Sequence, residues 1–90
     1  MKLSIGRRLL TVHDLDDAQT AYCRSRDLSG EGASTFRPGR VFASAKPMIQ
    51  IATISYNGRC WDMAGNPIEG AVADERELIG VANAARDVSP

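Results

Sequence analysis

The chain has 90 residues, of which 43% are hydrophobic and 24% charged, and its formal net charge is zero. This length supports one modest hydrophobic core, so we expect a single domain over residues 1–90, and apolar runs of only a few residues exclude a membrane-spanning helix. The basic N-terminal segment is not followed by the apolar stretch of a secretory signal, so we expect a cytoplasmic protein with reduced cysteines.

The first elements are a short strand and a helix. Residues 9–12 predict a short strand, which would be a fifth strand of the sheet if it joins the others. A helix is predicted over residues 14–27, with Asp14 as its N-cap and Asp16 and Asp17 in the first turn, where the helix dipole favours negative charge. Gly30 follows as a stop signal, and the small polar residues up to Thr35 predict a connector.

A β-hairpin is the clearest local prediction. Asn57-Gly58 is the dipeptide preferred at the two positive-φ positions of a type I′ turn. Pairing across such a two-residue turn places Ile54 opposite Trp61. One face of the hairpin would then be the core face, with Trp61 in the core, and the other would be mostly polar. The predicted core face carries Ala52, Ile54, Tyr56, Trp61 and Met63, and the polar face carries Thr53, Ser55, Cys60 and Asp62.

The hairpin belongs to a longer antiparallel meander with strands over residues 40–44, 48–56, 59–63 and 67–72. A second helix is predicted over residues 74–85, capped by Asp74 and carrying an apolar stripe that starts at Leu78. The predicted fold is therefore α+β, an antiparallel meander of about four strands packed against two helices.

Two segments resemble a known group of proteins. Arg26-Asp-Leu-Ser-Gly-Glu-Gly-Ala-Ser34 and Ile54-Ser-Tyr-Asn-Gly-Arg-Cys-Trp61 are similar to segments shared by small proteobacterial proteins. In that group a helix, a Ser-Gly-Glu-Gly-Ala-Ser-like loop and a hairpin of this type follow in the same order. No activity is known for the group, so the resemblance implies a bacterial cytosolic origin and no function.

Reactive side chains do not form a recognisable catalytic or metal-binding pattern. Cys23 falls within the first helix and Cys60 within a strand, where small half-buried side chains are common. Together with His13 they lack the spacing of a zinc site. The loop at residues 30–35 follows a helix and has no lysine, unlike a phosphate-binding P-loop. We therefore expect no catalytic residues, no metal and no cofactor.

A basic segment gives one functional lead. Residues 37–59 contain four basic residues and no acid, with aromatic residues nearby. Aromatic and arginine side chains on a sheet can stack on bases and contact phosphates, which is typical of nucleic-acid binding. The type I′ register counts against this interpretation, because it makes Trp61 a core residue. The candidate contact residues are Arg37, Arg40, Lys46 and Arg59.

The favoured hypothesis is a small non-enzymatic module that binds a protein partner or a second copy of itself. Sheet edges at residues 40–44 or 67–72 would supply the interface, because an exposed edge strand can pair with another chain. The alternative is a nucleic-acid-binding accessory protein that uses the basic segment. We expect no membrane partner.

Overall fold

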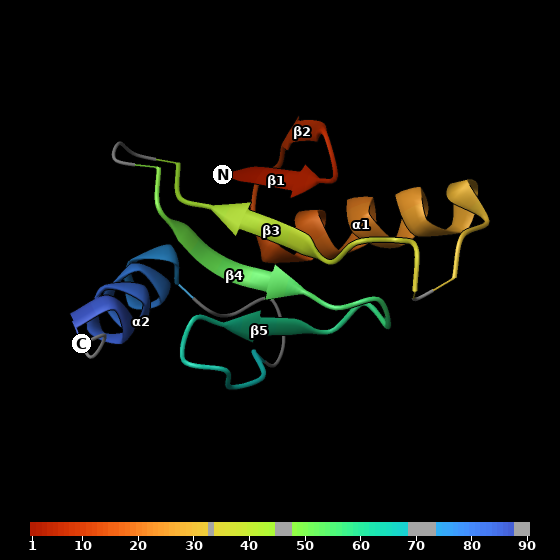
Figure 1. Cartoon of the computed structure of the whole chain (residues 1–90). Coiled ribbons are helices and arrows are strands. Elements are labelled where there is room, and N and C mark those ends of the chain that lie inside the picture. Colours follow the sequence, from red (N-terminus) through yellow and green to blue (C-terminus); the bar gives the residue numbers. More distant parts are fainter. Residues whose placement is uncertain (33, 45–47, 69–73, 88–90) are drawn as a thin grey trace.

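The computed structural model describes residues 1–32, 34–44, 48–68 and 74–87. Five strands and two helices form one α+β arrangement (Figure 1). None of the helices in this part of the chain is long and apolar enough to cross a membrane. The elements are β1 (Lys2–Ile5), β2 (Arg8–Thr11), α1 (Leu15–Ser29), β3 (Gly39–Phe42), β4 (Gln50–Ile54), β5 (Cys60–Asp62) and α2 (Glu75–Asp87).

The N-terminal residues form a complete hairpin. Strands β1 and β2 are antiparallel, and Ile5 pairs with Arg8 across the two-residue turn Gly6-Arg7. Gly6 has a φ of 58°, and glycine at the first central position is the pattern of a type II′ turn. The sequence therefore contributes two strands before α1, where only residues 9–12 were predicted.

The sheet is antiparallel throughout, with the strand order β2-β1-β3-β4-β5. Strand β3 pairs with β1 on one side and with β4 on the other. The prediction of an edge over residues 40–44 is therefore wrong, because the N-terminal hairpin occupies that side of β3. A register shift between Val41 and Phe42 marks a bulge in the β3–β4 pairing.

The turn between β4 and β5 differs from the prediction by one residue. Ile54 pairs with Cys60, and the Ser55 amide donates to the Arg59 carbonyl, so the loop has three residues, Tyr56-Asn57-Gly58. Only Gly58 has a positive φ, at 90°. Three-residue hairpin loops commonly consist of a turn followed by a glycine in the left-handed region, as observed here. A type I′ turn is excluded, because it would also need a positive φ at Asn57.

This turn is attached to α1 by side chains. Gln19 on α1 donates to the Gly58 carbonyl, and Arg26 Nη1 donates to the Tyr56 carbonyl at 2.7 Å. A Cβ atom at Gly58 would lie 2.8 Å from Cys23 Sγ, so the loop backbone approaches the helix closely. The extra loop residue is therefore held by contacts that are remote in sequence.

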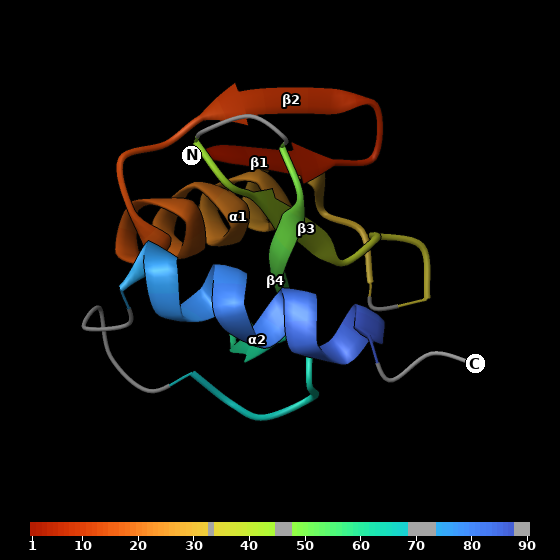
Figure 2. The same cartoon turned by 90° about the vertical axis from the view of Figure 1, so that its left-hand side faces the viewer.

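The helices begin where acidic residues precede them. Asp14 is the N-cap of α1 and accepts a hydrogen bond from the Asp17 amide at 2.8 Å, and Gly30, with a φ of 68°, is the C-cap. The Asp74 carboxylate accepts from the Arg76 amide at the start of α2. Helix α1 contacts β1 and β3, whereas α2 contacts β4 and β5. In Figure 2, α2 lies nearest the viewer and α1 lies farther back.

The predicted fourth meander strand is reduced to a single bridge in the described residues. Pro67 bridges Trp61, and the Ile68 amide donates to the Cys60 carbonyl at 2.9 Å. The rest of the prediction over residues 67–72 lies outside the described residues. One cluster of buried apolar side chains joins the helices to one face of the sheet, and it includes Leu3, Tyr22, Val41, Ile51, Ile54 and Leu78.

Candidate functional site

The second face of the sheet is polar, basic and accessible. Strand pairing aligns Leu9, Ser4, Arg40, Thr53 and Trp61 in one row across all five strands. A second row contains Thr11, Lys2, Phe42 and Gln50. None of these side chains is buried, and neither row contains an acid. We call these two rows the open face; at the usual spacing between strands the first row is about 19 Å long.

The one-residue difference in register changes the position of the tryptophan. Because successive side chains in a strand alternate between faces, pairing Ile54 with Cys60 places Cys60 on the core side and Trp61 on the open face. Cys60 is accordingly buried and Trp61 is half-buried. The predictions that Trp61 is a core residue and that Cys60 belongs to the polar face are therefore wrong.

Trp61 has a basic neighbour. The Arg59 guanidinium carbon lies 5.8 Å from the centre of the indole ring, within the range of a cation–π contact. The indole Nε1 donates to Ser55 Oγ at 3.1 Å, which fixes the orientation of the ring. An oriented indole and a guanidinium group are both surfaces on which nucleic-acid bases stack.

Other aromatic residues near the basic segment lie elsewhere. Phe36 is buried and makes an edge-on contact with Tyr22, with ring centres 5.4 Å apart. Tyr56 packs near Phe36, and its hydroxyl donates to the Glu31 carbonyl at 2.9 Å. Of the four aromatic residues in or next to residues 37–59, namely Phe36, Phe42, Tyr56 and Trp61, Phe42 and Trp61 lie on the open face.

The predicted basic contact residues are brought together in part. Arg40 is in the long row of the open face, and Arg37 lies two residues before β3 at one end of it. Both are exposed, and both line a hollow of about 640 Å³ that also touches Thr53. Arg59 lies beyond Thr53, next to Trp61. Lys46 lies outside the described residues.

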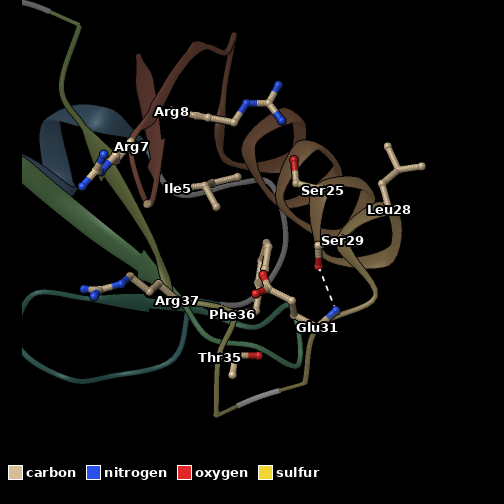
Figure 3. A pocket seen from close by; sticks show the side chains of 11 residues that line it. Ile5, Arg7, Arg8, Ser25, Leu28, Ser29, Glu31, Thr35, Phe36 and Arg37 are labelled. Carbon is tan, nitrogen blue, oxygen red and sulfur yellow. Dashed lines mark hydrogen bonds between the residues drawn. The ribbon is translucent and has the colours of Figure 1, made fainter.

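Arg7 was missed as a site residue by the sequence analysis. It lies in the β1–β2 turn and lines the same hollow as Arg37 and Arg40. The signal was present, because Gly6-Arg7 separates two short segments with strand character, but the turn was not identified. A second hollow of about 490 Å³ lies beside the first and shares Gly6, Arg7 and Arg37 with it (Figure 3).

The buried Cys60 thiol is poorly suited to act as a nucleophile. Burial raises the pKa of the Cys60 thiol, and a raised pKa reduces the thiolate fraction that a nucleophile needs. Cys23 is half-buried against the Gly58 backbone. Across the described residues, no three histidine, cysteine or acidic side chains gather closely enough to hold a metal ion.

Comparisons of the chain with protein-family models, with curated proteins and with solved structures find no match. The resemblance of residues 26–34 and 54–61 to small proteobacterial proteins stays a prediction.

Proposed function

We propose that this protein is a cytoplasmic, non-enzymatic module that binds single-stranded nucleic acid on the open face of its sheet. The observation that carries the proposal is the position of Trp61, half-buried on the open face with Arg59 beside it. Stacking on an aromatic side chain contributes about 1–3 kcal/mol per base, as judged by the loss on alanine substitution, and it depends little on base sequence.

The charges around Trp61 support an anionic ligand. The chain has zero net charge, but the ionisable residues of the open face are Lys2 and Arg40, with Arg59 and Arg37 next to them. The salt bridge found in the described part of the chain joins Arg26 to Asp27, away from this face. The basic side chains of the open face are therefore available to phosphate groups.

The salt dependence of binding gives a quantitative test. If Arg37, Arg40 and Arg59 each neutralise one phosphate of a single strand, the slope of log affinity against log salt is about −2. A fourfold rise in salt should then weaken binding roughly 15- to 20-fold. Binding of an oligothymidylate of about ten nucleotides, a length within the usual site sizes, can be followed through quenching of Trp61, the single tryptophan of the chain.

Three variants complete this experiment. Arg40→Ala and Arg59→Ala should each weaken binding and reduce the salt slope, whereas Arg24→Ala on the exposed side of α1 removes the same charge and should leave both unchanged. Anisotropy of an internally labelled oligonucleotide provides a second readout. The proposal fails if no binding is found at low salt, or if Arg24→Ala weakens binding as much as Arg40→Ala.

A second candidate function is pairing with a protein partner or a second copy of the chain. In the described part of the chain, β2 pairs with β1 on one side only, and Leu9 on it is 59% exposed. An exposed edge strand can add a strand from another molecule. Light scattering at increasing concentration tests self-association, and Leu9→Lys should abolish it; a monomer at all concentrations would contradict self-association.

A further inference from the structure

The hollow lined by Arg7, Arg37 and Arg40, which we call the arginine hollow, is assembled from separate parts of the chain. Arg7 comes from the β1–β2 turn, Arg37 from the segment before β3, and Arg40 from β3 itself. The backbone at Arg37 is anchored, because its carbonyl accepts a hydrogen bond at 3.0 Å from the hydroxyl of the buried Tyr22. The backbone at Arg37 and Arg40 is therefore well supported, since Arg40 also lies in a strand that is paired on both sides.

The arginine hollow contains donors and no carboxylate. Its lining residues other than the arginines are Gly6, Pro38, Gln50 and Thr53, all of them uncharged. Thr53 Oγ1 accepts from Gln50 Nε2 at 3.1 Å, which leaves the threonine hydroxyl proton free to donate. Within the described residues, none of the three arginine side chains forms a salt bridge or a hydrogen bond. Mutual repulsion of three like charges is relieved by an anion.

The neighbouring hollow has a different character. It is lined by Ile5, Leu28 and Phe36 and includes the acidic Glu31, so it is partly apolar and less favourable to an anion. Figure 3 shows the guanidinium groups of Arg7 and Arg37 extended to one side, away from Leu28 and Ser29 of α1. These two arginines therefore direct their charge toward the arginine hollow, although they also border its neighbour.

We infer that the arginine hollow binds a phosphate monoester, namely the terminal phosphate of the strand that the proposed function places on the open face. This inference rests on the proposed function. The arginine hollow lies next to Trp61, because Thr53 borders the hollow and pairs with Trp61 in the sheet. A terminal phosphate carries a charge of about −1.5 to −2 at neutral pH and offers three acceptor oxygens, which suits three guanidinium groups. An internal phosphodiester carries only one negative charge.

Arg7 and Arg8 provide a matched pair of variants. They are adjacent and both exposed, but Arg8 lines only the neighbouring hollow. We would compare oligonucleotides of one sequence that carry a 5′-phosphate, a 3′-phosphate or neither, each labelled on an internal base. One phosphorylated form should bind about tenfold more tightly than the unphosphorylated strand, as expected for one added charge-assisted hydrogen bond. Arg7→Ala should remove this preference and Arg8→Ala should retain it.

The outcomes separate this inference from the proposed function. Equal binding of all three oligonucleotides would overturn the inference and leave the proposed function in place. A preference that Arg8→Ala also removes would overturn the assignment to the arginine hollow. Calorimetry with inorganic phosphate tests the hollow alone: phosphate binding that Arg7→Ala abolishes, without binding of any oligonucleotide, would support the anion site and overturn the proposed function. Absence of binding by phosphate and oligonucleotides would overturn both.

Discussion

Substitution of Gly39 by alanine tests the packing of α1 on the sheet. An added Cβ atom would lie 2.8 Å from Tyr22 Cδ1 and 3.1 Å from Leu3 Cδ1. Both neighbours are fully buried, and the Tyr22 hydroxyl is bonded to the Arg37 carbonyl, so neither side chain can move away easily. Overpacking of this kind costs about 1–3 kcal/mol. The Tm should fall by about 4–8 °C for each kcal/mol in a domain of this size.

Gly80→Ala is the matched control for this experiment. Gly80 lies inside α2, and nothing lies within 4 Å of the Cβ that alanine would add. Alanine in a helix is favoured over glycine by about 1 kcal/mol, so this variant should be more stable than the original protein. Urea unfolding followed by circular dichroism measures both variants. The packing described for β3 and α1 is refuted if Gly39→Ala is as stable as the original protein.

Three further predictions concern the β4–β5 hairpin. Gly58→Ala should lower the free energy of unfolding by about 1–2 kcal/mol because the backbone at Gly58 is left-handed, and any further loss would come from the clash of the new Cβ with Cys23 Sγ. Adding Cys23→Ala should recover only the part of the loss that is due to this clash. Strict additivity of the two substitutions in the free energy of unfolding would contradict the close contact. Ile54→Ala should cost about 2–5 kcal/mol, more than Trp61→Ala despite the larger side chain of tryptophan, and the reverse order in urea unfolding would place Trp61 in the core. Burial raises the pKa of the Cys60 thiol above its ordinary value of 9.0, so the unfolded chain loses this proton first. The free energy of unfolding should therefore fall as pH rises through about 9, less steeply in Cys60→Ala, and an equal slope in that variant would contradict this assignment.

The elements with local signals were predictable from the sequence. Asp14 and Gly30 marked the ends of α1 because capping depends on residues adjacent in the chain. The α+β class and the antiparallel sheet followed from strand patterns of the same local kind. The N-terminal hairpin was only partly predicted, because Gly6-Arg7 is a less common turn dipeptide than Asn-Gly.

The candidate site depended on a register that the local sequence did not determine. Asn57-Gly58 suits both a two-residue and a three-residue loop, and Gln19 and Arg26 of α1 bind the three-residue loop that is observed. The partners in these two hydrogen bonds are 39 and 30 residues apart in the chain. The shift of one residue then moved Trp61 from the predicted core to the open face. The register argument that counted against the nucleic-acid hypothesis therefore does not hold, for a reason that lies in tertiary structure.

The attachment of the β4–β5 loop to α1 also has a mechanical consequence. Gln19 and Arg26 lie two helical turns apart, so the loop is held at two points along a rigid rod. Any tilt of α1 must therefore carry the end of the hairpin, and with it the indole of Trp61, relative to Arg40 in the middle of the sheet. The distance between the indole of Trp61 and Arg40 therefore depends on the orientation of α1.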